Sequence, residues 1–273
     1  MDDEFCEEMR RVGNLSLSIS LEGFEEVNDM RRGEGVFDKV MAAMDRLKKY
    51  GLIFGTSICY TRKNIETVTS DEFLDMIIGK GCRFTWYFHY MPVGNDAAPD
   101  LLPTKEQREY MYHRVREIRG VTGGKPIYAM DFQNDGEFVG GCIAGGRNYC
   151  HINANGDVEP CVFIHYSSAN IREVTLLEAL KQPLFMAYRD RQPFNSNHLR
   201  PCPMLENPEI LQEMIKETGA KSTDLQSPES AEHLCSKCKA YACEWKKTAD
   251  QLWKEHPHQQ KGYTNYKKRV EKQ

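Results

Sequence analysis

The sequence contains no apolar run that approaches the ~20 residues of a membrane span, so we expect no membrane segment. It also lacks an excess of basic residues, because its 36 lysines and arginines are set against 40 acidic residues. That balance gives no electrostatic reason to expect nucleic acid as a partner. The acidic, polar start at residues 1–4 is unlike a secretory signal. We therefore expect a cytoplasmic protein, the alternative being an exported protein held by disulfides.

What the sequence does contain is cysteine, unevenly distributed. Seven of its ten cysteines lie in the second half, and Cys142 and Cys161 enclose the spacing C-x13-G-x4-C. Thiols at such spacings, in a chain without an export signal, indicate metal ligands rather than disulfides. The seven candidate metal ligands are Cys142, Cys150, Cys161, Cys202, Cys235, Cys238 and Cys243.

Residues 1–135 alternate helix-like and strand-like segments. Period-two alternation of apolar residues indicates strands, and apolar residues at helical spacing indicate helices. Strands that alternate with helices predict a parallel sheet in an α/β fold. We expect helices at 3–12, 36–50, 70–78 and 104–119, strands at 15–21, 52–60 and 82–91, and one further candidate strand at 126–131.

Residues 136–245 show a different sequence pattern, with short predicted strands, many glycines and most of the cysteines. Residues 246–273 form a basic tail that we interpret as a solvated helix and chain end. A β-hairpin is predicted at 149–161, where Asn155-Gly156 suits the two positive-φ positions of a type I′ turn. Helices are predicted from 175 to about 189 and from 207 to 219, and a third runs to 255 from about 231 or from beyond the cysteines.

Three chemistries fit the cysteine pattern. An iron–sulfur cluster needs up to four converging thiolates, and a hairpin with one cysteine before it and one at its exit brings two together. Zinc is the main alternative, because C-x2-C is a common zinc half-site that His233 or His256 could complete. Inert thiols are the third. The isolated cysteines of the first half are interpreted as small core residues: Cys6, Cys59 and Cys82.

Residues 18–23 read S-I-S-L-E-G and are followed by R-R-G at 31–33, while residues 88–94 read F-H-Y-M-P-V-G. In order and spacing these stretches resemble the fourth strand with its loop and helix, and the sixth strand with its exit loop, of the radical S-adenosylmethionine (radical SAM) enzymes. C-x13-G-x4-C fits the C-x9-15-G-x4-C opening of their SPASM/twitch extension, which holds auxiliary iron–sulfur clusters. The resemblance implies a partial (β/α)6 barrel of about three parallel strands, followed by a cysteine-rich α+β extension.

The resemblance also implies roles for individual residues. Ser20 and Glu22 match positions that contact the ribose and amino group of S-adenosylmethionine, at the end of a parallel strand where ligands bind. Arg32 matches an arginine that meets the carboxylate of this cofactor, a task suited to a planar guanidinium. Pro92 and Gly94 match a loop near the adenine.

Cys142 and Cys161 match ligands of an auxiliary [4Fe-4S] cluster. Cys235, Cys238 and Cys243 form C-x2-C-x4-C, whereas the usual run is C-x2-C-x5-C-x3-C. One cluster is therefore predicted and a second is left open, with Cys150 and Cys202 as further candidate ligands.

One hallmark of the family is absent, the C-x3-C-x2-C motif that holds the radical-generating cluster. There is also no room for three strands before Leu15. We therefore predict the C-terminal portion of such an enzyme, either as a fragment or as one chain of a split enzyme whose other half comes from a partner chain. An unfinished barrel would leave a parallel edge strand unpaired.

In the complete enzyme, a reduced cluster would cleave S-adenosylmethionine, and the resulting radical would abstract hydrogen from a peptide or small molecule. Ferredoxin or flavodoxin would be the reductant. The chain would contribute part of the cofactor pocket and the auxiliary site of this oxidoreductase. The alternatives are a non-catalytic iron–sulfur electron-transfer or partner subunit, and a zinc-stabilised interaction module.

Overall fold

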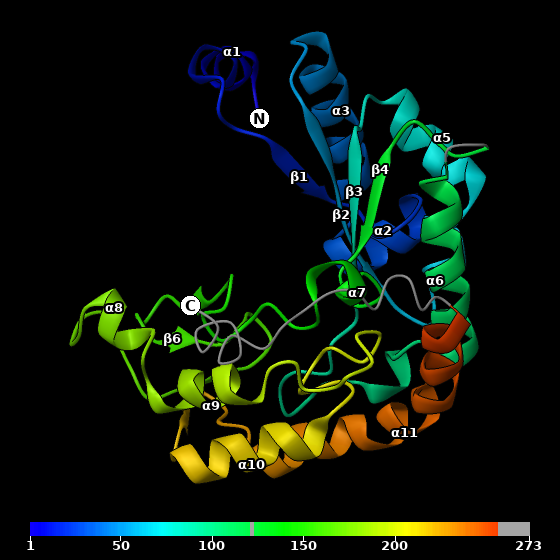
Figure 1. Cartoon of the computed structure of the whole chain (residues 1–273). Coiled ribbons are helices and arrows are strands. Elements are labelled where there is room, and N and C mark those ends of the chain that lie inside the picture. The colour runs from blue at the N-terminus through cyan, green and yellow to red at the C-terminus, as the bar shows by residue number, and fades with distance from the viewer. Residues whose placement is uncertain (121–122, 256–273) are drawn as a thin grey trace, which may run out of the picture. The chain divides into compact units, whose positions relative to one another are not determined.

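A computed structural model describes residues 1–120 and 123–255 of the chain. The chain divides into two compact units, each described here by itself (Figure 1). The first comprises Met1–Tyr90 and Asp100–Phe132, and the second comprises Met91–Pro99 and the chain from Gln133 onward. The segment Met91–Pro99 therefore belongs with the cysteine-rich unit. The domain boundaries expected at residues 135 and 245 stay predictions.

The first unit is built on a four-stranded parallel sheet. Its strands follow the chain in the order β1 (Leu17–Ser20), β2 (Phe54–Tyr60), β3 (Phe84–His89) and β4 (Tyr128–Asp131). Because all three pairings are parallel, the carboxyl ends of the strands lie at one edge of the sheet. The sheet confirms the predicted α/β class and the candidate strand at 126–131. It holds four strands where about three were expected.

Three helices of the first unit begin at side chains that accept the free N–H groups of the first helical turn. Asp2 caps α1, Ser70 caps α5, and Thr104 forms a capping box with Gln107 at α6. The four predicted helices are confirmed, whereas α2 and α4 were not foreseen. The helical elements are α1 (Asp3–Val12), α2 (Glu25–Arg32), α3 (Val36–Lys49), α4 (Ile65–Thr69), α5 (Asp71–Gly79), the 3-10 turn η1 (Pro99–Leu101) and α6 (Lys105–Ile118).

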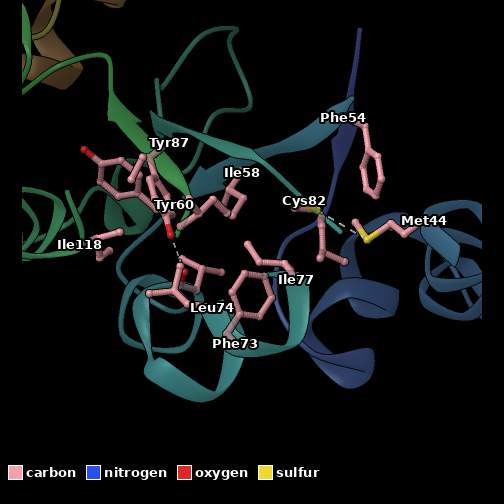
Figure 2. Close-up of a cluster of buried hydrophobic side chains, with 14 of the residues drawn as sticks. Met44, Phe54, Ile58, Tyr60, Phe73, Leu74, Ile77, Cys82, Tyr87 and Ile118 are labelled. Carbon is pink, nitrogen blue, oxygen red and sulfur yellow. Dashed lines mark hydrogen bonds between the residues drawn. The ribbon is translucent and has the colours of Figure 1, made fainter. Parts of the chain in front are cut away.

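The core of the first unit lies where one face of the sheet packs against helices. Figure 2 shows Ile58 and Tyr87 of the strands gathered with Leu74 and Ile77 of α5, all fully buried. Burial of each such aliphatic side chain stabilises the fold by about 1.5–3 kcal/mol. Cys82 is fully buried beside Met44, and Cys6 is fully buried in another part of the same core. Both thiols are therefore core residues, as the sequence predicted. Cys59 is only partly buried.

The strand β1 pairs only with β2, so its other edge has no partner strand among the described residues. A parallel edge strand with free N–H and C=O groups is a site where another strand can add. The prediction of an incomplete barrel is compatible with this edge.

The second unit combines small antiparallel sheets with three longer helices. In it α10 packs against both α9 and α11. Strands β5 and β6 form the hairpin that the sequence predicted, and β7 pairs with β8. Its elements are α7 (Gly136–Val139), β5 (His151–Ile152), β6 (Val158–Glu159), β7 (Tyr166–Ser167), α8 (Leu176–Ala179), α9 (Pro183–Arg191), α10 (Pro208–Thr218), β8 (Lys221–Ser222) and α11 (Ala231–Glu255).

The predicted type I′ turn in the hairpin is wrong. Gly156 has φ +92°, but no non-glycine residue described has a positive φ, so Asn155 does not take the first of the two positive-φ positions. The pairing of Ile152 with Val158 leaves a five-residue loop. The reason is Asn153, whose side-chain oxygen accepts the N–H groups of Asn155 (2.9 Å) and Asp157 (3.0 Å) and shapes the loop from within.

The single helix predicted from Thr175 to about residue 189 is also wrong, because the segment forms two helices. Thr175 caps α8 through a capping box with Glu178, as expected. Pro183 lacks an N–H and cannot continue that helix, so it takes the first position of α9 instead. The side chain of Gln182 fixes the break by donating to the carbonyl of Val158 (2.7 Å).

In the described ranges, no helix combines the length and hydropathy that a bilayer crossing requires.

His89, at the end of β3, generates a prediction about acid stability. Its side chain is buried edge-on against Tyr60, and burial, reinforced by the nearby charge of Arg108, lowers its pKa to about 3. In the unfolded chain the imidazole binds a proton below about pH 6.5. The unfolded state thus holds more protons between these values, so the free energy of unfolding should fall as the pH drops from about 6.5 toward 3.

The measurement is urea unfolding of the wild type and of His89→Gln at pH 7.5 and 4.5. The loss of stability should be smaller in His89→Gln, whereas the exposed control His113→Gln should behave as the wild type. An equal acid-induced loss in wild type and His89→Gln would contradict the assignment.

Candidate metal centre

Cys142 lies in a loop whose backbone is fixed by two side chains. The guanidinium of Arg147 donates to the carbonyls of Cys142 (2.8 Å) and Val139 (2.6 Å). The amide of Gln192 donates to the carbonyls of Cys142 (3.2 Å) and Ala144 (2.9 Å). Burial raises the pKa of the Cys142 thiol to about 11, and the N–H of Ala144 partly offsets this by hydrogen bonding to the sulfur. The thiol is held in a defined place and is neutral unless a metal displaces its proton.

Cys161 follows the hairpin and enters a tight turn. Its carbonyl accepts the N–H of Ile164 at 3.2 Å, and the same two residues form an isolated β-bridge. Burial, followed by the proximity of Cys142, raises the pKa of the Cys161 thiol to about 12. The N–H groups of Phe163 and Ile164 act in the opposite direction by donating to the sulfur.

Cys202 comes from a third segment, before α10. Its backbone N–H donates to the buried carboxylate of Glu206 (2.7 Å), and its sulfur accepts the N–H of Leu205 (3.4 Å). Burial raises the pKa of this thiol well above its usual value, and Glu206, Cys142 and Cys161 raise it further. Cys142, Cys161 and Cys202 therefore lie within electrostatic range of one another.

Tyr188 of α9 marks the region where these thiols gather. Its side chain is fully buried, and its hydroxyl has no hydrogen-bond partner among the described residues. Burial raises the pKa of the hydroxyl well above its usual value, and the thiols of Cys161, Cys142, Cys202 and Cys235 add to the shift. No local sequence pattern indicates that Tyr188 lies near these thiols, because a buried tyrosine in a helix is normally a core residue.

The remaining candidate ligands differ in placement. Cys235 and Cys238 lie one turn apart on α11, both fully buried, and burial raises the pKa of each to about 12. Glu206 acts on Cys238 as it does on Cys142 and Cys202, so the helix lies near the first three thiols. Cys150 is partly buried against a small apolar cluster, and Cys243 is exposed.

These residues fit an iron–sulfur group. All ten cysteines are free, and each of Cys142, Cys161 and Cys202 has a backbone N–H donor at its sulfur, a contact that tunes the potential of iron–sulfur clusters. In the chain as described, no three His, Cys, Asp or Glu side chains are arranged to hold a single ion. A zinc ion binds all of its donor atoms at about 2.0–2.3 Å from one metal. In an iron–sulfur cluster each thiolate binds a different iron, so the sulfur atoms of the cysteines lie farther from one another.

The two histidines proposed for zinc stand as follows. The Nδ1 of His233 lies 2.7 Å from the carboxylate of Glu229, and His256 falls outside the described residues.

The residues predicted to bind S-adenosylmethionine lie in both units. In the first unit, Ser20 ends β1, and the carboxylate of Glu22 is 1% exposed, where it accepts the guanidinium of Arg32 and the N–H of Cys59 (3.1 Å). In the second unit, Pro92 and Gly94 lie in the segment Met91–Pro99. These assignments and those of the individual cysteines stay predictions.

Comparison with known proteins places the cysteine-rich unit in a family. Residues 142–204 match SPASM, described as an iron–sulfur cluster-binding domain. The chain is 31% identical over 156 residues to "Mycofactocin maturase MftC" of Mycolicibacterium smegmatis, covering 55% of this chain and 39% of that protein. It is 23% identical over 214 residues to "AdoMet-dependent heme synthase" of Oleidesulfovibrio alaskensis, covering 69% and 54%. The chain thus spans about half the length, or less, of these curated relatives.

Among solved structures, the chain resembles "Native anSMEcpe with bound AdoMet and Cp18Cys peptide", with a TM-score of 0.53 and 13% identity. The match covers 92% of this chain and 74% of that one, which establishes a shared fold. The fold and the matched cysteines define a protein with a SPASM iron–sulfur domain. These similarities support the predicted likeness to radical SAM/SPASM enzymes, and the SPASM match favours an iron–sulfur cofactor over zinc.

The burial of the thiols predicts an order of chemical modification in the metal-free chain. Raised pKa values leave little thiolate at pH 7.5, and only thiolate reacts rapidly with iodoacetamide. We expect the exposed Cys243 to be alkylated first, and Cys142, Cys161 and Cys202 to react much more slowly. Timed quenching and peptide mass spectrometry measure each rate. Equal rates at Cys243 and Cys161 would show that the buried thiol site does not exist in solution.

Proposed function

We propose that the chain is the C-terminal portion of a radical SAM/SPASM enzyme and holds an auxiliary [4Fe-4S] cluster at Cys142, Cys161 and Cys202. A fourth thiolate comes from Cys235 or Cys238 on α11. The observation that carries the proposal is the convergence of thiols from separate segments near Tyr188, within and beside the SPASM match. When bound, such a cluster supplies a redox centre or a substrate-binding iron.

The chain's own residues would orient this cluster. Backbone N–H groups at the sulfurs stabilise the thiolate form and would tune the reduction potential of the bound cluster. Arg147 and Gln192 hold the Cys142 loop in place. Cys150 and Cys243 are left as candidates for a second cluster, because five other cysteines suffice for the first.

We further propose that the first unit contributes to the binding of S-adenosylmethionine through Ser20, Glu22 and Arg32, and that Pro92 and Gly94 approach the adenine. Glu22 is supported by its position at the carboxyl end of a parallel strand and by its buried pairing with Arg32. The AdoMet-bound state of the structural neighbour supports the same cofactor.

The proposed substrate is a peptide or a small molecule. The peptide in the structural neighbour favours the first, and the heme synthase relatives favour the second. The reductant would be a ferredoxin or flavodoxin of the cytoplasm. The free edge of β1 is where the remaining barrel strands would add, from a longer chain or a partner.

A second candidate function is a non-catalytic iron–sulfur electron carrier or partner subunit. This candidate predicts a reversible low-potential couple without binding of S-adenosylmethionine, whereas the first predicts binding.

Substitution of a single thiol tests the cluster assignment. Cys161→Ser should lower the iron bound after anaerobic reconstitution to less than about half of the wild-type value, because three thiolates hold a [4Fe-4S] cluster less firmly than four. Cys59→Ser, which alters a partly buried thiol of the first unit, is the matched control and should retain full iron. Iron content and visible absorbance measure both variants. Wild-type iron in Cys161→Ser would remove this residue from the ligand set.

Cofactor binding is tested separately with the reconstituted chain. We expect the wild-type chain to bind S-adenosylmethionine in equilibrium dialysis. Arg32→Ala should weaken this binding at least about tenfold, because the carboxylate of the cofactor loses its charged partner. Chromatography after reduction should detect no 5′-deoxyadenosine. Unaided cleavage would contradict the proposal that this chain lacks the radical-generating centre.

A further inference from the structure

Both backbone polar groups of Gly94 form hydrogen bonds with a buried ion pair of the second unit. The N–H of Gly94 donates to the carboxylate of Glu229 (2.9 Å), and its carbonyl accepts the ammonium of Lys237 (2.7 Å). Glu229 and Lys237 also pair directly, and their side chains are only 8% and 7% exposed. Gly94 is 135 residues from Glu229 and 143 from Lys237, so no local sequence pattern indicates this contact. We call this arrangement the Gly94 clamp.

Neighbouring contacts fix the Gly94 clamp in place. Asn95 donates to the carbonyl (2.9 Å) and the hydroxyl (2.8 Å) of Ser227. The hydroxyl of Tyr166 donates to the carbonyl of Glu229, and His233 lies 2.7 Å from its carboxylate. Because Glu229 is held by its main chain and its side chain together, Met91–Pro99 cannot shift without breaking a buried charged contact.

The helix that supplies Lys237 also supplies two candidate cluster ligands. Lys237 lies between Cys235 and Cys238 on α11, within a single helical turn. The charges of Lys237 and Glu229 both act on Cys238. Any displacement that metal ligation imposes on this turn is transmitted to the ammonium group that holds Gly94.

We propose that Glu229 and Lys237 are positioning residues that couple ligation of Cys235 or Cys238 to the order of Met91–Pro99, and thereby to the affinity for S-adenosylmethionine. The inference rests on the proposed function, which gives these thiols to the cluster and Gly94 to the adenine site. By thermodynamic linkage, the cofactor in turn strengthens cluster retention by the same factor.

The amide of Gly94 is a direct probe, because its hydrogen bond to Glu229 is part of the clamp. Residue-resolved hydrogen–deuterium exchange at Gly94 is compared in the iron-loaded and iron-free full chain. We expect the iron-loaded wild type to exchange at least about tenfold more slowly and to bind S-adenosylmethionine more tightly by a comparable factor. Lys237→Met, which keeps the apolar stem but removes the donor, should abolish both differences.

Lys239→Met is the matched control, since Lys239 is exposed on the same helix and should leave both differences intact. The double variant Glu229→Gln/Lys237→Met avoids an unpaired buried carboxylate and should behave as Lys237→Met does. Circular dichroism checks that Lys237→Met and the double variant both fold.

Two outcomes overturn the inference while leaving the proposed function standing. One is an iron-loaded wild type whose Gly94 amide exchanges as fast as in the iron-free chain. The other is a folded Lys237→Met that keeps the full difference. A chain that takes up no iron fails at the earlier step, and iron analysis of the same sample identifies that failure and overturns both.

Discussion

Burial of thiols from separate segments in one electrostatic neighbourhood is the constraint on which the second unit depends. In the metal-free state the thiols of Cys142, Cys161 and Cys202 are protonated, because neither burial nor their mutual proximity tolerates several negative charges. Metal ligation displaces those protons, and the positive charge of the iron compensates the buried thiolates that form. The backbone N–H groups at the sulfurs and the rigid loop of Cys142 are arranged for the thiolate form.

The first unit follows a similar principle with a carboxylate. Glu22 is buried at the end of β1 and compensated by Arg32 and by the N–H of Cys59. A charged group that is fixed in this way at the carboxyl edge of a parallel sheet is suited to a ligand with both positive and negative groups. In each unit, the residues with candidate chemistry are therefore held by buried hydrogen bonds rather than left on mobile surface chains.

The sequence predicted what local patterns determine. Apolar spacing located α3, capping residues located α5 and α6, and period-two alternation located β1. It missed the loop shaped by the Asn153 side chain and the helix break at Pro183, because a proline is compatible both with ending a helix and with starting one. The placement of Cys202 near Cys142, and of Lys237 at Gly94, depends on tertiary packing over long chain separations and has no local signal.

The most direct test of the account is the amount of iron, acid-labile sulfide and zinc per chain after anaerobic purification, with an electron paramagnetic resonance spectrum of the reduced sample. The account predicts about four irons with matching sulfide and the signal of a reduced [4Fe-4S] cluster, or about eight if a second cluster is present. Zinc without iron, or no metal at all, would contradict it.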